Sequence, residues 1–162
     1  MMGTGVHAVD LLRFMLGQEI IEVAAITDGQ TESQPLETMS AATLRFDGGA
    51  LATVCCGRSL PDSINDFTLY GTHGRATGRA TRWESRQGRV SIASDTVNHT
   101  QTYPSQFLGN FTSQMEQFAR AVEEDEIPAA TGVDGLRVVE VTLAMIRSAR
   151  EGRTVKVSAV EI

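Results

Sequence analysis

The stretch Ala41-Ala-Thr-Leu-Arg-Phe-Asp-Gly-Gly-Ala-Leu-Ala-Thr-Val-Cys-Cys-Gly57 predicts a β-hairpin. In its first half, apolar and polar side chains alternate from Ala42 to Phe46, the two-residue period of a strand with one buried face. Asp47-Gly48-Gly49 supplies turn chemistry, and residues 50–57 return as a second strand. A hairpin pairs its strands antiparallel, because parallel neighbours need a long crossover connection.

The antiparallel pattern continues on both sides of this hairpin. Short apolar or β-branched runs separated by turn residues predict further strands at Glu19–Thr27, Asp66–Tyr70, Arg75–Trp83, Arg89–Ala93, Val97–Thr102 and Val155–Val157. We expect loops at Asp28–Glu37 and Leu60–Asn65, and a turn around Gln87-Gly88.

Three stretches have helical spacing instead. The first runs from about Val6 to Leu16 and should end at Gly17, and the second runs to about Glu124. The third follows Thr131-Gly132-Val133-Asp134, which has the spacing of a capping box, and should end at Gly152. Their apolar stripes are Val9, Leu12 and Leu16; Phe111, Met115, Phe118, Ala119 and Val122; and Leu136, Val139, Leu143 and Ile146.

These elements predict an α+β fold in which a single large, mostly antiparallel, open-faced β-sheet has helices packed on one face. The 162 residues suit one domain, residues 1–162. The strand at Ala50–Gly57 is small or apolar on both faces, as is Ile20–Ile26. Because exposed apolar patches commonly mark interfaces, we expect a homodimer or tetramer built sheet against sheet.

Bulk properties exclude several classes of function. A net charge of −6 and a pI near 5.0 argue against nucleic-acid binding, which needs a basic surface. No apolar run approaches the length of a membrane span. The two cysteines, Cys55 and Cys56, are adjacent and poorly placed for a disulfide, so we expect a cytoplasmic protein.

His7 and Asp10 form the candidate catalytic pair. They stand three residues apart on the first expected helix, so both side chains should emerge on one face. An imidazole beside a carboxylate can accept a proton at neutral pH, although a structural His–Asp pair fits the same spacing. No Cys, His and acid cluster has metal-ligand spacing, so we expect no metal site.

Several segments resemble, in order, the C-terminal domain of the glucose–fructose oxidoreductase, inositol dehydrogenase and MocA (Gfo/Idh/MocA) family. The resemblance covers nearly the whole chain. It is carried by residues 5–17 (GVHAVDLLRFMLG), 44–53 (LRFDGGALAT), 69–75 (LYGTHGR), 111–122, 131–136 (TGVDGL) and 148–155 (SAREGRTV).

This resemblance implies a fold similar to the C-terminal domains of dihydrodipicolinate reductase and glyceraldehyde-3-phosphate dehydrogenase. It also implies a parent enzyme whose upstream Rossmann domain binds NAD or NADP, with a sugar, cyclitol or related polyol or ketone as substrate. His7 then matches the family's histidine beside the carbon that exchanges hydride, and Asp10 matches the acid that follows it. The resemblance also points to pairing of subunits through the sheet.

Two departures from the family stand out. No strand is followed by G-x-G-x-x-G, so we expect this chain to bind no cofactor itself. Gly3 stands where the family usually has a polar residue, four positions before the histidine. The alternative to a redox domain is a stand-alone binding or oligomerisation module.

Overall fold

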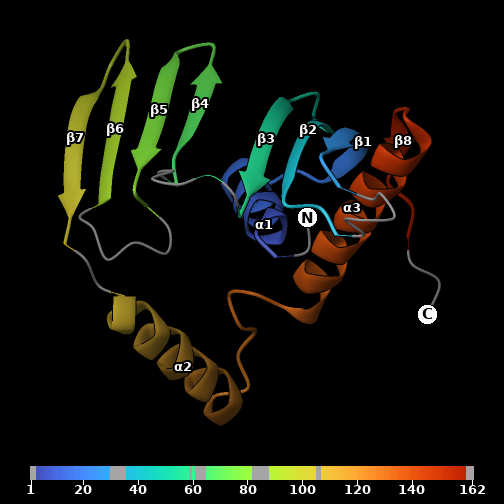
Figure 1. Cartoon of the computed structure of the whole chain (residues 1–162). Helices are drawn as coiled ribbons and strands as arrows, with labels where there is room; N and C mark the ends of the chain where they lie inside the picture. The colour runs from blue at the N-terminus through green and yellow to red at the C-terminus, as the bar shows by residue number, and fades with distance from the viewer. Residues whose placement is uncertain are drawn as a thin grey trace. The chain divides into compact units, whose positions relative to one another are not determined.

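The computed structural model describes residues 3–29, 36–58, 60, 65–81, 88–104 and 107–159. They divide into two compact units, unit 1 (Met1–Pro61 with Ala130–Ile162) and unit 2 (Asp62–Ala129). Figure 1 labels the elements: α1 (Gly5–Leu16), β1 (Ile20–Thr27), β2 (Met39–Phe46), β3 (Leu51–Gly57), β4 (Phe67–Gly71), β5 (Gly74–Arg79), β6 (Gly88–Ser94), β7 (Asn98–Tyr103), α2 (Phe107–Glu123), α3 (Gly132–Glu151) and β8 (Val155–Lys156).

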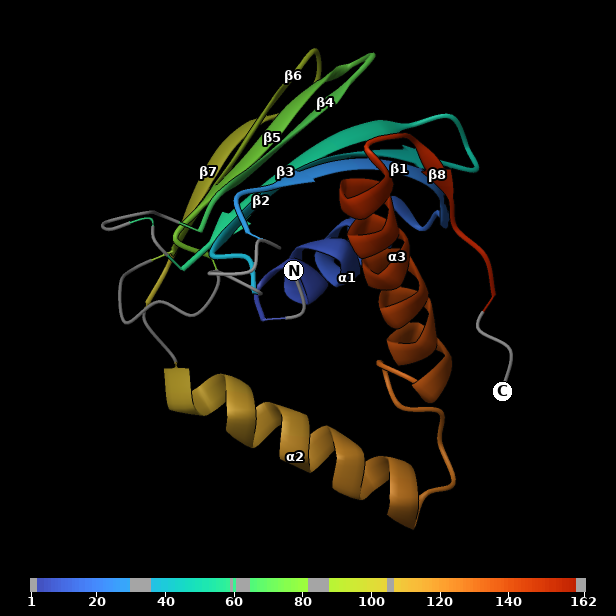
Figure 2. The same ribbon diagram turned by 45° about the vertical axis from the view of Figure 1, so that its right-hand side comes forward.

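Unit 1 is built on an antiparallel sheet with strand order β3-β2-β1-β8, called sheet 1 below. The predicted alternation of β2 is confirmed, since Ala42, Leu44 and Phe46 are buried and the residues between them are exposed. In the register of the sheet, Leu44 pairs with Val23 on one side and Ala52 on the other. Helices α1 and α3 lie against the same face of sheet 1 (Figure 2).

The hydrophobic core of unit 1 lies between sheet 1 and its two helices. Burying these side chains removes apolar surface from water, the main force that holds the layers together. The members are Val9, Ile20, Val23, Ala25, Ala42, Leu44, Phe46, Val54, Val138, Val141, Ala144, Met145 and Val155.

Helix α1 follows its predicted pattern closely. Val9 is fully buried, and Leu12 and Leu16 pack against the core. The helix ends at Gly17, whose φ of 60° is the left-handed conformation that favours glycine, and the Gly17 amide donates to the Arg13 carbonyl at 2.8 Å.

Helix α3 has the predicted capping box and C-terminal glycine, but it buries a different face from the predicted one. Val139 and Leu143 of the predicted stripe are 40% and 44% exposed, whereas Val141 and Met145 are almost fully buried. Polar residues obscure the buried stripe in the sequence: Thr142 is buried because its hydroxyl donates to the Val138 carbonyl at 2.7 Å.

Unit 2 holds a second antiparallel sheet, with order β4-β5-β6-β7, together with α2. Phe67 on β4 lies directly opposite Gly78 on β5, where any side chain would collide with the ring. Helix α2 forms where the spacing predicts it. However, every side chain from Phe111 to Arg120 is exposed, so its apolar stripe is not buried among the described residues.

The α+β class and the antiparallel strands are therefore confirmed, but the described strands form two sheets of four and not one large sheet. The hydrogen-bonded ladder stops at Gly57 and a new one starts at Phe67. The sequence between them contains Pro61, which has no amide hydrogen to donate to a ladder. The predicted break at Pro61, the turn at Gln87 and the end of the strand at Trp83 lie outside the described residues.

Candidate active site

His7 and Asp10 lie on the exposed face of α1. His7 is exposed, and the Asp10 side chain is 58% exposed. Both emerge from the first two turns of the helix because its opposite face, centred on Val9, is buried against the core. Both side chains therefore stand on one accessible face of α1.

Phe14 extends this face and was missed in the sequence. It stands seven residues after His7, so it falls on the same stripe as His7 and Asp10. Its side chain is 82% exposed, which is unusual for a phenylalanine. The position of Phe14 at helical spacing from the pair is a signal that the sequence did contain.

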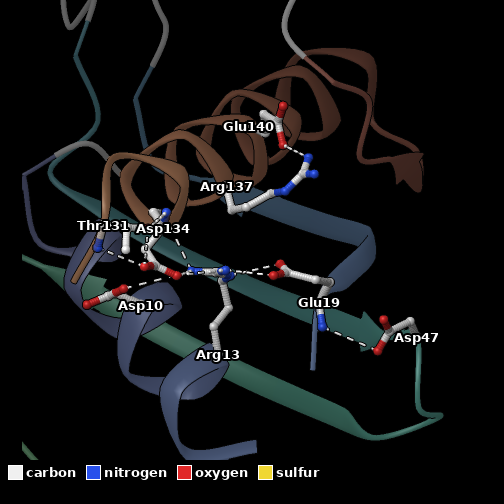
Figure 3. Close-up of polar contacts among 8 residues, drawn as sticks. All are labelled: Asp10, Arg13, Glu19, Asp47, Thr131, Asp134, Arg137 and Glu140. Carbon is white, nitrogen blue, oxygen red and sulfur yellow. Dashed lines mark hydrogen bonds and ion pairs between the residues drawn. The ribbon is translucent and has the colours of Figure 1, made fainter. Parts of the chain in front are cut away.

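Arg13 lies beneath Asp10 and is buried (Figure 3). Its Nε and Nη2 donate to the two carboxylate oxygens of Glu19 at 2.8 and 2.6 Å, a bidentate pair. The guanidinium also approaches Asp134 Oδ1 at 3.4 Å and Asp10 Oδ1 at 4.0 Å. One cation thus faces three carboxylates, one of which belongs to the candidate pair.

These contacts shift the acid–base properties of the cluster. The pKa of Arg13 is raised above its ordinary value, first because Glu19 accepts its hydrogen bonds. The same hydrogen bonds lower the pKa of Glu19. Asp134 has a lowered pKa chiefly because the Thr131 hydroxyl donates to it, with Arg13 as a weaker cause. All three groups are therefore held in their charged forms at neutral pH.

Arg58 lies next to the residue that departs from the family pattern. A side chain at Gly3 would begin 3.6 Å from Nη2 of Arg58. Arg58 directly follows β3, and among the described residues its guanidinium forms no ion pair. Sequence reasoning did not find this neighbour, because it depends on where the end of β3 lies relative to the start of α1.

Neither the glycine-rich segment Gly71–Gly78 nor the start of α3 resembles a dinucleotide site. The pyrophosphate of a dinucleotide needs a glycine-rich turn from a strand into a helix N-terminus. The glycine-rich segment Gly71–Gly78 instead joins β4 to β5 within a hairpin, and the N-terminus of α3 already holds the carboxylate of Asp134. No group of three or more His, Cys, Asp and Glu side chains that could hold a metal ion occurs in the described part of the chain.

The other singled-out residues lie on elements other than α1. His73 stands in the turn between β4 and β5, with Nδ1 3.8 Å from Asp95, and His99 lies on β7. Cys55 is exposed, while Cys56 faces the helices with its sulfur 3.0 Å from the Ser40 hydroxyl. No helix among the described residues is long and apolar enough to cross a membrane.

Known proteins resemble this chain over almost its full length. Residues 1–157 match the model of the Gfo/Idh/MocA oxidoreductase family, C-terminal alpha/beta domain. The chain is 24% identical to 1,5-anhydro-D-fructose reductase of Ensifer adhaerens, over 94% of this chain and 45% of that protein. It is also 24% identical to myo-inositol 2-dehydrogenase of Thermotoga maritima, over 96% of this chain and 48% of that protein.

A solved structure shows the same fold. Levoglucosan dehydrogenase in complex with NADH and L-sorbose superposes with a TM-score of 0.81 at 19% identity, over 98% of this chain and 50% of that one. The chain thus spans about half the length of the relatives it matches. Because the family model matches residues 1–157, the chain belongs to the Gfo/Idh/MocA oxidoreductase family and corresponds to its C-terminal alpha/beta domain.

Proposed function

We propose that this chain is the substrate-side domain of an NAD(P)-dependent oxidoreductase that acts on a sugar, a cyclitol or a related polyol or ketone. The observation that carries the proposal is the shared exposed face of α1, on which His7 and Asp10 stand in a chain of this family. The relatives are named as a sugar reductase and an inositol dehydrogenase, which supports a polyhydroxylated substrate.

In the proposed reaction, this chain transfers the proton. Oxidation of a secondary alcohol removes a hydride from carbon and a proton from the hydroxyl oxygen. In this proposal the imidazole of His7 accepts that proton, and Asp10, three residues later on the same helix, stabilises the imidazolium that results. In the reverse direction the same imidazolium returns the proton to the reduced oxygen.

The cofactor is held elsewhere in this proposal. The described residues offer no cradle for a pyrophosphate, and the chain spans about half of its relatives. We therefore assign the dinucleotide to a Rossmann domain upstream of this one, which would dock on the face that carries His7, Asp10 and Phe14. The strong exposure of Phe14 supports a contact surface there. Two free thiols, Cys55 and Cys56, support a reducing cytoplasmic location.

The test uses the full-length protein that carries this domain and follows nicotinamide absorbance over a panel of sugars and cyclitols. His7→Ala should lower kcat by on the order of a hundredfold or more, because general-base catalysis is lost. His73→Ala is the matched control, since His73 is exposed and belongs to unit 2. Equal turnover of the two variants would refute the role of His7.

We also propose that two copies of the chain associate through sheet 1. Its open face consists of the side chains of β1, β2 and β3 that point away from the helices. Small residues such as Ala24, Ala41 and Thr43 occupy the middle of this face, and Ile26 and Leu51 are 77% and 71% exposed. An accessible face of small and apolar side chains, which also carries the Glu22–Arg45 ion pair, supports a self-complementary, two-fold contact.

Substitution and thiol labelling test this association. Thr43→Asp should convert the dimer to a monomer in light scattering, because it would bury an unpaired charge, and Thr96→Asp in an exposed turn should not. In a Cys56→Ala background, alkylation of Cys55 should slow as protein concentration rises, since Cys55 lies on the open face. A monomer at about tens of micromolar would contradict the proposal.

A further inference from the structure

Arg13 ties α1 to two other elements of unit 1. Its side chain is only 8% exposed, and its guanidinium meets Glu19 at the head of β1 and Asp134 in the first turn of α3 (Figure 3). Burial of a charge is tolerated only where partners compensate for lost water. Arg13 is therefore held by its partners in one place, and α1 is held with it.

The contacts fix the orientation of the guanidinium as well as its position. Two nitrogens are bound to the two oxygens of Glu19, which sets the plane of the group. Nη1 and Nη2 then face Asp134, with Nη1 3.5 Å from both its carboxylate Oδ1 and its backbone carbonyl. A lysine could supply the positive charge at this position, but it could not form these hydrogen bonds to Glu19 and Asp134 from one planar group.

Asp134, the partner of Arg13 on α3, is itself held by hydrogen bonds. Asp134 Oδ2 accepts the Thr131 amide at 2.9 Å and the Thr131 hydroxyl at 2.7 Å, while the Asp134 amide donates back to that hydroxyl at 3.3 Å. The carboxylate thus caps α3 with one oxygen and receives Arg13 with the other. Movement of α1 would require either the cap or the ion pair to break.

Asp10 and His7 lie on the helix that Arg13 holds. Asp10 is one turn before Arg13 and 4.0 Å from its Nη1, and His7 is one further turn away. Because an α-helix turns as a rigid body over so short a distance, the rotation that satisfies Arg13 also sets the direction of the exposed pair. A small rotation of α1 would displace both side chains.

We propose that Arg13 is a positioning residue of the active site, which holds α1 in the rotation that presents His7 and Asp10 to the substrate. This inference rests on the proposed function of that pair. Arg13 does not touch the substrate in this scheme. It acts through the helix, and its partners Glu19 and Asp134 share the role.

Nuclear magnetic resonance of this chain tests the positioning without any activity. The sequence has three histidines, so the ring signals of His7, His73 and His99 can be assigned, and the latter two lie in unit 2 as internal controls. Arg13→Gln, or the milder Glu19→Gln if that variant does not fold, should shift or broaden the His7 signals alone. Glu22→Gln is the matched control, because it breaks the 2.9 Å Glu22–Arg45 ion pair on the open face instead.

Kinetics of the full-length protein test the catalytic consequence. Arg13→Gln should lower kcat by about ten- to hundredfold while KM for the nicotinamide cofactor changes by less than about twofold, because misaligned reacting groups slow chemistry rather than cofactor binding. Arg13→Lys should restore much of the thermal stability but little of kcat. A purely structural role of the buried charge would instead let lysine restore both.

The outcomes separate this inference from the function on which it rests. Unchanged His7 signals in a folded Arg13→Gln or Glu19→Gln variant would overturn it, as would unchanged kcat in Arg13→Gln. If His7→Ala removes activity while Arg13→Gln does not, only the positioning role is wrong. If His7→Ala leaves activity intact, the proposed function fails first and the positioning role with it.

Discussion

The hydroxyl of Ser148 on α3 accepts the backbone amide of Ala25 on β1 at 2.9 Å. The same hydroxyl donates to the Arg153 carbonyl at 2.6 Å. β8 pairs with β1 at Glu22 and Val23 and does not extend to Ala25, so the Ala25 amide would otherwise be buried without an acceptor. A side chain from the helix thus completes the edge of the sheet.

Ser148→Ala should therefore lower the free energy of unfolding by about 1–3 kcal/mol, because it leaves the Ala25 amide unsatisfied. Urea denaturation would measure the change. Ser158→Ala, at an exposed position, should change it by less than about 0.5 kcal/mol. A loss at position 148 no larger than at position 158 would show that water replaces the hydroxyl.

Two arginine–glutamate pairs should differ sharply in their contribution to stability. Arg13→Met removes the partner of Glu19 and should cost about 1.5–3 kcal/mol, because the charge-assisted hydrogen bonds of the buried guanidinium to Glu19 and Asp134 are lost. Arg45→Met removes a pair with Glu22 in which Arg45 is 57% exposed, and should cost less than about 1 kcal/mol. Similar losses in chemical denaturation would contradict the assignment of Arg13 to the core.

Acid should destabilise the chain through specific carboxylates. The pKa of Glu19 is lowered by the hydrogen bonds from Arg13, and the pKa of Asp28 is lowered chiefly by the Thr38 hydroxyl. A group with a lowered pKa in the folded state stabilises fully above its unfolded pKa of about 4, and this contribution is lost as pH falls through the folded pKa.

The free energy of unfolding should accordingly change little between about pH 7 and 5 and fall steeply below about pH 4. Glu19→Gln should make that fall shallower, since one of the titrating groups is removed. Denaturation curves at several pH values would measure both slopes. An unchanged slope in Glu19→Gln would exclude Glu19 as a contributor.

The same substitution should have opposite effects at two glycines. Gly17 has a φ of 60° with open space around it, so Gly17→Ala should cost about 1 kcal/mol through backbone strain alone. Gly135 lies inside α3, also in open space, so Gly135→Ala should gain about 0.5–1 kcal/mol from helix propensity. Thermal or urea unfolding of the two variants checks the signs, and two losses would refute the assignment of Gly135 to a regular helix.

The chain by itself should not bind NAD or NADP. The described residues provide no strand-to-helix glycine turn, and Asp134 places a negative charge at the start of α3 where a phosphate would have to sit. Isothermal titration calorimetry should show no binding at low-micromolar concentrations. Saturable low-micromolar heat would overturn this expectation.

Local signals made much of unit 1 predictable. Gly17 and Gly152 end their helices because both adopt the left-handed conformation, and the Thr131–Asp134 spacing gave the start of α3. The alternation from Ala42 to Phe46 identified the buried face of β2. These features depend on residues within one turn or one strand, which is the range that a sequence pattern contains.

What failed depends on contacts between distant segments. Arg13 can contact both Glu19 and Asp134 only if the start of β1 lies next to the start of α3. Arg13 and Asp134 are 121 residues apart in the sequence, so no local pattern contains this contact. The buried face of α3 was missed because Thr142 and Ser148 are polar but satisfied. The helices were expected to pack on one face of the sheet, whereas the apolar stripe of α2 is exposed among the described residues.

Asp134 both caps α3 and pairs with Arg13, and this has a consequence for chimeras between this domain and its relatives. A chimera whose crossover falls anywhere between residues 14 and 133 takes Arg13 from one parent and Asp134 from the other. If the second parent has a different residue at either place, the hybrid combines a buried guanidinium with a mismatched helix start. Successful crossovers should therefore keep residues 13, 19, 131 and 134 from a single parent, however freely the strands between them are exchanged.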